Sequence, residues 1–183
     1  CVTQQWAMGI GSQRKELFDE KAHQEWADVR ARFPTLDIFS NIGIAQIIHT
    51  PLSAIESLIA SINAQALIVH TNPLQECIQP EGTPQFKGAW DALAQLCASL
   101  SCPVIVKETG CGFSAKTLQR LADIGVDVVD VAGLGGTHWG RIEGKRAKEQ
   151  SIHAHTSQTF QNWGIETAQC INTAMHLPID IDI

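Results

Sequence analysis

The sequence predicts an α/β fold built on a parallel sheet. Short apolar runs rich in valine and isoleucine alternate with amphipathic stretches, as they do when buried parallel strands alternate with helices. Polar residues directly follow several of these runs. Parallel strands in one sheet require crossover connections, which the amphipathic stretches supply. The predicted strands are Trp6–Ile10, Asp37–Ile42, Ala66–His70, Val104–Lys107, Val126–Val131 and Leu177–Ile183.

Three of the connecting segments carry helix signals. Thr50 and Pro51 are suited to cap and start a helix whose apolar residues between positions 52 and 62 share one face. Ser114 begins a second helix, and Gly125 ends it before the next strand. A third helix covers residues 90–100. Each predicted helix therefore lies between two predicted strands.

The spacing of the strands favours a (β/α)8 TIM barrel. Such a barrel uses about 31 residues per strand–helix unit and about 250 in all. Six predicted strands in 183 residues make a single barrel domain over residues 1–183 that lacks its first and last segments. The alternative is an open doubly wound sheet, which usually carries Gly-x-Gly-x-x-Gly after its first strand. Residues 9–14 contain only the first half of that pattern.

Composition excludes several kinds of partner. The net charge of −6 and the isoelectric point near 5.6 argue against a nucleic-acid or membrane-surface binder. No apolar run approaches the roughly 18 residues of a membrane span, and no signal peptide is visible. The six cysteines form no Cys-x-x-Cys pair, which predicts reduced thiols and a cytoplasmic location. An anionic ligand would therefore be held by local amides, a few cations and a metal.

The richest polar segment is residues 70–82, which follows the third predicted strand. His70 and Asn72 are two positions apart, which places them on the same face of an extended strand end, where both can donate to phosphate oxygens. Glu76 offers the hard oxygen ligand that Mg²⁺ prefers. Gln75 has no useful pKa, so alone it can only position, polarise or relay. Glu81 is a candidate to lie next to the metal ligand without binding the metal itself.

Two other strand ends carry groups suited to a cofactor or an anion. After the first strand, glycines allow close approach to the backbone, Ser12 offers a hydroxyl, and Arg14 offers forked donors for phosphate. Asn41 can present an amide donor and a carbonyl acceptor to a heterocycle edge. A solvated arginine and a simple turn are the alternatives at these positions.

The fourth and fifth strand ends add a cation and exposed amides. Lys107 ends an apolar run, and a buried ammonium needs an anion or an electron-rich acceptor. A plain salt bridge to Glu108 is the alternative. Gly135 and Gly136 expose backbone N–H groups, and Thr137 adds a hydroxyl.

Residues 70–82 resemble, nearly letter for letter, the signature of the type 2 isopentenyl-diphosphate isomerases, which depend on FMN. The Gly-x-Gly-Ser-Gln-Arg of residues 9–14 is similar to another motif of that family. So are the Val-Ala-Gly-x-Gly-Gly-Thr and Arg-x-Glu of residues 131–143 and the Trp-Gly-Ile-x-Thr-Ala of residues 163–168. The resemblance covers essentially residues 7–178, in the family's order and spacing.

The resemblance implies an intramolecular isomerase of isoprenoid biosynthesis that interconverts isopentenyl and dimethylallyl diphosphate by a redox-neutral 1,3-proton shift. It implies reduced FMN, Mg²⁺ and NADPH as reductant, a small diphosphate substrate, no nucleic acid or membrane, and a homotetramer or homo-octamer. The implied catalytic residues are Gln75 and His70; the substrate residues are Arg14, His70, Asn72 and Gln75; the cofactor residues are Ser12, Asn41, Lys107, Thr137, Gly135 and Gly136; and the metal ligand is Glu76.

Two family segments have no counterpart in the sequence: a basic opening segment and a final Gly-Gly segment that binds the FMN phosphate. We therefore expect this segment to be inactive alone. An FMN hydroxy-acid oxidase is the second hypothesis, although it needs a His–Arg pair that the strand ends do not show. A barrel remnant without activity is the third. Residues 149–158 are predicted to be a loop or lid, and Trp163 to serve packing.

Overall fold

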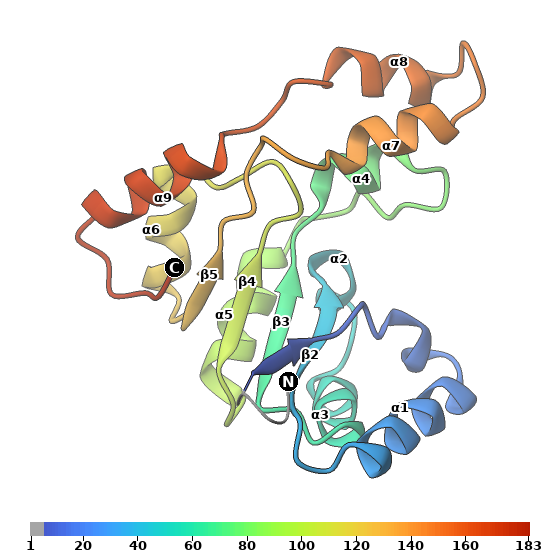
Figure 1. Cartoon of the computed structure of the whole chain (residues 1–183), viewed down its shortest axis with the longest axis vertical. Helices are drawn as coiled ribbons and strands as arrows, with labels where there is room; N and C mark the ends of the chain where they lie inside the picture. The colour runs from blue at the N-terminus through green and yellow to red at the C-terminus, as the bar shows by residue number, and fades with distance from the viewer. Residues whose placement is uncertain (1–5) are drawn as a thin grey trace.

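The computed structural model describes residues 6–183 and is organised around one five-stranded sheet (Figure 1). All strands are parallel, and their order in space is their order in the chain, β1-β2-β3-β4-β5. The strands are β1 (Ala7–Gly9), β2 (Asp37–Gly43), β3 (Ala66–His70), β4 (Val104–Lys107) and β5 (Val128–Asp130).

Helices connect the strands and extend the chain beyond β5. The first half of the chain contains the 3₁₀ helix η2 (Arg14–Leu17), α1 (Glu20–Arg32), α2 (Ile44–Ile47), α3 (Leu52–Ser61), α4 (Pro73–Ile78) and α5 (Ala89–Ser99). The second half contains α6 (Ala115–Asp123), α7 (Trp139–Arg146), α8 (Ile152–Thr159) and α9 (Thr167–His176). Helices α4, α7 and α8 pack together beyond the carboxyl ends of the strands (Figure 1).

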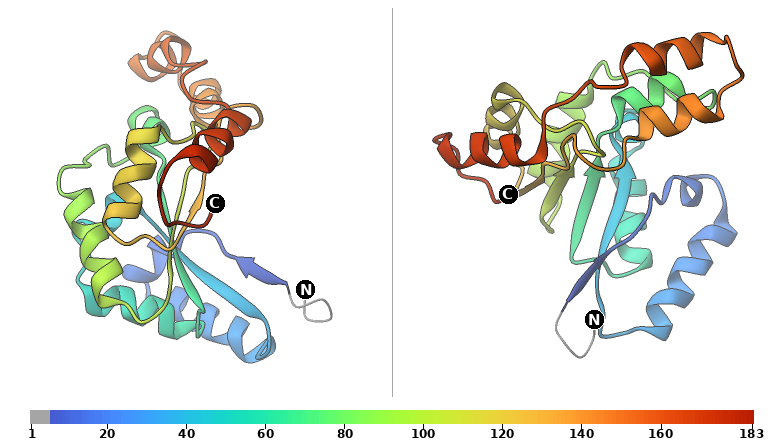
Figure 2. Two further views of the ribbon diagram at one scale, coloured as in Figure 1. Left: turned by 90° about the vertical axis from the view of Figure 1, so that its left-hand side faces the viewer. Right: turned by 45° about the horizontal axis from the view of Figure 1, so that its top comes forward.

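One face of the sheet is covered by α3, α5 and α6, which line one side of it in Figure 2. Consecutive parallel strands joined by right-handed crossovers place their helices on the same face. Alternate strand residues such as Leu67, Val69 and Val106 are fully buried against those helices. On the opposite face Ile105 and Val128 are only partly buried.

The prediction of a TIM barrel is wrong for the described residues. Five strands form an open, all-parallel half-barrel sheet with helices, and β1 and β5 do not pair with each other. The doubly wound alternative is also wrong, because that fold reverses its strand order and covers both faces. The common cause is that alternating patterns predict parallel strands and crossovers, whereas strand order and closure depend on contacts that no local pattern records.

The last two predicted strands are shorter than expected. Val126 donates its backbone N–H to Leu121 at the end of α6 (3.1 Å), so β5 begins later. In residues 177–183 only Asp182 pairs with the sheet, accepting from the Val129 N–H (2.8 Å) and donating to the Asp127 carbonyl (3.2 Å). Asp180 and Asp182 stay exposed, since an unpaired carboxylate is costly to bury.

The residues predicted to begin and end a helix are confirmed for α6, and the predicted cap is corrected for α3. The Ser114 hydroxyl accepts from the Thr117 N–H (3.2 Å), and Gly125 follows the helix with φ +84°. At α3 the N-cap is Pro51, and the Thr50 hydroxyl instead donates to the Gln46 carbonyl (2.8 Å). The predicted helix over 90–100 is α5.

The predicted loop over residues 149–158 is largely the helix α8. Ser151 caps this helix by accepting from the Ala154 N–H (3.2 Å), and the Ser157 hydroxyl ties it to the Gly140 carbonyl (2.7 Å). The missed signal was Ser151, which directly precedes the first residue of α8. The packing role predicted for Trp163 is also wrong, because this side chain is 49% exposed.

The five described cysteines are free thiols, and Cys170 is the one that is fully buried. Burial raises the pKa of Cys111 to about 12, with the Glu108 carboxylate adding to the shift. Among residues 6–183 we find no helix with the length and apolar character needed to cross a membrane.

An isoleucine pair tests the helix-covered core. Ile55 on α3 is 0% exposed and Ile152 on α8 is 72% exposed. Ile55→Ala should lower the free energy of unfolding by about 2–5 kcal/mol through lost burial and a cavity. Ile152→Ala should change it by less than about 0.5 kcal/mol. Urea unfolding of both variants checks this, and equal losses would contradict the core assignment.

Candidate functional site

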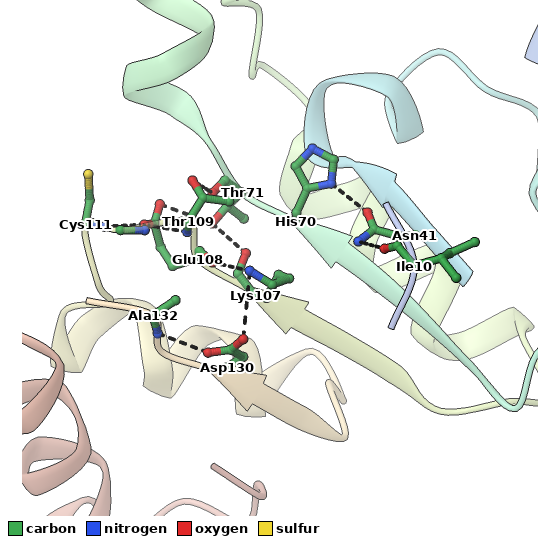
Figure 3. Close-up of polar contacts among 11 residues, drawn as sticks. Ile10, Asn41, His70, Thr71, Lys107, Glu108, Thr109, Cys111, Asp130 and Ala132 are labelled. Atoms are coloured by element: carbon green, nitrogen blue, oxygen red, sulfur yellow. Dashed lines mark hydrogen bonds and ion pairs between the residues drawn. The ribbon is translucent and has the colours of Figure 1, made fainter. Parts of the chain in front are cut away.

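The register of the sheet brings four residues to one level at the carboxyl ends of the strands. Gly43 pairs with His70, His70 with Lys107, and Lys107 with Asp130. Residues paired in this way project from the same face of a sheet. That face is the one opposite to α3, α5 and α6. His70, Lys107 and Asp130 therefore form a polar strand-end row (Figure 3).

The tautomer of His70 is fixed by Asn41. The Asn41 Nδ2 donates to the Ile10 carbonyl (2.9 Å), which can only accept, so the Asn41 Oδ1 faces the ring nitrogen Nδ1 of His70 (2.8 Å). Nδ1 must then carry the proton, and Nε2 keeps its lone pair. Burial, followed by the positive charge of Lys107, lowers the pKa of His70 to about 4, while Glu76 opposes the shift. At neutral pH this side chain is an uncharged acceptor at Nε2.

A side chain at residue 43 would crowd the His70 ring. A Cβ at residue 43 would lie 3.0 Å from His70 Nε2 and closer still to the Gln46 Oε1. The backbone of β2 therefore passes directly beside the imidazole. The sequence predicted Asn41 as a contact at this strand end but did not reveal why a glycine follows two residues later.

Lys107 is held by its own strand end and by β5. Its Nζ donates to the Glu108 carbonyl (2.7 Å) and lies 3.8 Å from the Asp130 carboxylate. The salt bridge considered between Lys107 and the Glu108 side chain is thus replaced by one to Asp130. The side chain of Lys107 remains 28% exposed, so it is accessible from the open face.

The carboxylate of Glu108 organises the loop after β4. Its Oε2 accepts from the backbone N–H groups of Thr109 (2.8 Å), Gly110 (2.9 Å) and Cys111 (2.5 Å). Burial raises the pKa of Glu108, and these backbone donors oppose the rise. Glu108 is therefore a loop-organising residue and not part of the strand-end row.

A second polar group lies on α4. The Asn72 Nδ2 donates to Glu76 Oε1 (3.0 Å) and to Gln75 Oε1 (3.2 Å), and Glu76 Oε2 accepts from the Thr83 N–H (2.6 Å). Asn72 and Glu76 are both buried. The Asn72 Oδ1 is buried with no hydrogen-bond partner among the described residues. We call Asn72, Gln75 and Glu76 the α4 group.

Glu143 on α7 joins the α4 group, and sequence reasoning missed it as a functional residue. Gln75 Nε2 donates to Glu143 Oε1 (3.2 Å), and Arg146 lies 3.4 Å from the same carboxylate. Glu143 is only 3% exposed. The available signal was the Arg-x-Glu motif at residues 141–143, which carried no assigned role.

The expected shared face of His70 and Asn72 is not present. Strand β3 ends at His70, and Asn72 is the N-cap of α4, with Pro73 at the first helical position. Pro73 ends the two-residue alternation because it cannot continue the ladder. His70 consequently turns toward Asn41, and Asn72 turns toward Glu76.

The remaining predicted residues flank these two groups. The Ser12 hydroxyl accepts from the Arg14 N–H (3.3 Å), and Arg14 lines a hollow of about 340 Å³ together with His49 and Thr83. Gly135, Gly136 and Thr137 are exposed, and a Cβ at either glycine would meet no atom within 4 Å. Within residues 6–183, no hydrogen bond connects these flanking residues to the strand-end row.

The part of the chain that the structure describes contains no group of three or more histidine, cysteine, aspartate or glutamate side chains that could hold a metal ion. A cation shared between one carboxylate and a bound phosphate needs fewer protein ligands.

Together these features define an α/β half-barrel protein with polar groups gathered at its strand ends. The chain matches no established family model. It is 58% identical over 183 residues to the isopentenyl-diphosphate delta-isomerase of Legionella pneumophila, covering the whole chain and 54% of that relative.

Two further relatives carry the same name. The protein from Bdellovibrio bacteriovorus is 51% identical over 176 residues, covering 96% of this chain and 51% of the relative. The protein from a Nostoc species is 40% identical over 178 residues, covering 94% and 50%. The chain thus spans about half the length of the curated relatives that it matches.

These names correct the narrower resemblance. They state isopentenyl-diphosphate delta-isomerase without a type and without a cofactor. The prediction of the type 2 family in particular is therefore not supported, and the likeness extends to isomerases of that name alone.

The low pKa of His70 predicts a specific loss of stability in acid. The pKa of His70 is about 4 in the folded protein and 6.5 in the unfolded chain. The contribution of the neutral ring to stability is therefore fully present above pH 6.5 and is lost as the pH falls toward 4. His70→Gln should remove roughly 2 kcal/mol of the destabilisation that the parent shows between pH 7 and pH 4.5. Urea unfolding at both pH values measures it, with exposed His155→Gln on α8 as the matched control. An unchanged pH dependence in His70→Gln would contradict the burial of the neutral ring.

Proposed function

We propose that this chain carries the site of an isomerase that interconverts isopentenyl and dimethylallyl diphosphate. The relatives' shared name supports the reaction, and the strand-end row beside the α4 group is the observation that carries it. The reaction removes a proton from one carbon of an allylic unit and adds one at another, without net oxidation. A homotetramer or homo-octamer remains a prediction.

The diphosphate is assigned to residues that offer donors around the strand ends. Arg14 is exposed and provides a permanent cation with forked geometry. The His70 ring is an acceptor when neutral, so it becomes a phosphate donor only when a bound anion raises its pKa. Both Nδ2 hydrogens of Asn72 are already donated to Gln75 and Glu76, so of these two amides Gln75 is the one with a hydrogen left for a phosphate oxygen.

A divalent cation fits the α4 group. Glu76 Oε1 and Oε2 each accept one hydrogen bond, which leaves carboxylate lone pairs free. The buried Asn72 Oδ1 without a protein partner is the kind of atom that a cation or its water satisfies. Glu76 would hold Mg²⁺ with Asn72 beside it, and substrate oxygens would complete the shell.

FMN fits the open face between β4 and the loop after β5. Lys107 at the end of β4 supplies a cation that can stabilise negative charge on a reduced ring, while Asn41 lies near the end of β2 and Ser12 follows β1. Gly135, Gly136 and Thr137 supply unobstructed backbone amides and a hydroxyl. Bound reduced FMN would supply the acid and base of the proton shift, with NADPH as its reductant.

Gln75 is assigned a positioning role. Its carboxamide has no useful pKa, and both of its ends are occupied, by the Asn72 amide and the Glu143 carboxylate. The buried Glu143 and its neighbour Arg146 fix the orientation of Gln75. The chain's own contribution is therefore to bind, orient and polarise.

The oxidase alternative is not favoured. That chemistry needs a histidine paired with an arginine that grips a carboxylate. Within residues 6–183 the partner of the His70 ring is Asn41, and no hydrogen bond connects His70 to an arginine.

The proposed reaction is tested in D₂O with the purified full-length protein, isopentenyl diphosphate, reduced FMN and Mg²⁺. Deuterium should enter both product and recovered substrate, and NADPH consumption should remain far below turnover. Glu76→Gln should lower kcat/KM by roughly a hundredfold or more and leave the affinity for FMN within severalfold.

Glu81→Gln is the matched control, because Glu81 is exposed in the same segment. It should retain activity at saturating Mg²⁺. Consumption of one NADPH per product would contradict the isomerase proposal. A magnesium dependence that is unchanged in Glu76→Gln would remove Glu76 from the metal site.

A further inference from the structure

Gln13 is a buried polar side chain to which the proposed function gives no role. It is 1% exposed, although the preceding Gly11 and Ser12 and the following Arg14 are exposed. Burying an amide is costly unless its hydrogen-bonding groups are paired. A glutamine amide has two donor hydrogens and two acceptor lone pairs.

All four hydrogen-bonding sites of the Gln13 amide are filled. Nε2 donates to Glu16 Oε2 (2.8 Å) and to the Leu58 carbonyl (3.2 Å). Oε1 accepts from the Ser40 hydroxyl and from the Asn41 N–H (3.2 Å). A flipped amide would place its oxygen against the Leu58 carbonyl and the Glu16 carboxylate, so the orientation is determined by its surroundings.

Gln13 binds both backbone hydrogen-bonding groups of Asn41. Its own N–H donates to the Asn41 carbonyl (2.8 Å), while its Oε1 accepts from the Asn41 N–H. The paired residues of β1 and β2 end at Gly9 and Phe39. Gln13 therefore extends the ladder with a side chain where the strand β1 has already ended.

The two hydrogen bonds between Gln13 and the Asn41 backbone, here called the clamp, are supported from outside the strand-end row. The buried Glu16, which accepts from Gln13, also lies 2.7 Å from a ring nitrogen of His23 on α1. Leu58, whose carbonyl accepts from Gln13, is a buried residue of α3. Two helices, α1 and α3, thus support the Gln13 amide, so its position is set by these helices and not by the loop that contains Gln13.

We propose that Gln13 is a positioning residue that acts through Asn41 to set the tautomer of His70. The clamp fixes the Asn41 backbone, which places Asn41 Nδ2 on the Ile10 carbonyl and Asn41 Oδ1 on Nδ1 of His70. His70 thereby keeps its proton on Nδ1 and a lone pair on Nε2. Any effect of this arrangement on turnover rests on the proposed function, whereas the tautomer of His70 follows from the hydrogen bonds alone.

The test is ¹⁵N NMR of the histidine rings at neutral pH, with the His70 signals assigned by their loss in His70→Gln. The parent should show the shifts of an Nδ1–H tautomer. Gln13→Met, which keeps the approximate volume but removes all four hydrogen bonds, should move both ring shifts toward the average of the two tautomers. Gln24→Met on the exposed side of α1, where the amide donates to Asp28, is the matched control and should retain the parent's shifts.

Unchanged His70 shifts in a folded Gln13→Met protein would overturn the proposal, whatever the isomerase assay shows. If Gln13→Met does not fold, Gln13→Met combined with Glu16→Leu decides, because the second change removes the buried carboxylate that the first leaves without its donor. The double variant should show averaged His70 shifts, and unchanged shifts in that folded protein would equally overturn the role of Gln13.

Discussion

The parallel register of β2 to β5 is the constraint on which the rest of the structure depends. It brings Gly43, His70, Lys107 and Asp130 to one level. Because the strands follow one another in order, α3, α5 and α6 cover one face and leave the other open (Figure 2). The polar row therefore stands at the rim of an open face, supported from behind by an apolar core.

The strand ends carry two polar groups with different supports. In the strand-end row, His70 is held by Asn41. Asn41 is held in turn by the Ile10 carbonyl and by the buried Gln13, which is bound to α3. The α4 group is fixed through Glu143 of α7, so it depends on the helices beyond the sheet. The two groups present charged side chains at the same end of the sheet, Lys107 and Asp130 in the strand-end row and Glu76 in the α4 group.

Much of this arrangement was predictable from local sequence patterns. The strands β3 and β4 match their predicted bounds, and α6 begins after Ser114 and ends before Gly125 as predicted. Strand order, the open edges and the late start of β5 were not predictable, because they depend on long-range pairing. For the site, residue types at strand ends indicated positions, but not partners: nothing local shows that Asn41 faces His70 or that Glu143 faces Gln75.

The proposed binding of ligands at the strand ends of the open face is tested by a crystal structure of the protein with FMN. Flavin density is expected beside Lys107 and His70, at the strand-end row. Density instead in the apolar hollow lined by Trp90 and Phe113, on the helix-covered side of the sheet, would contradict it. So would a saturated crystal with no density at the strand ends.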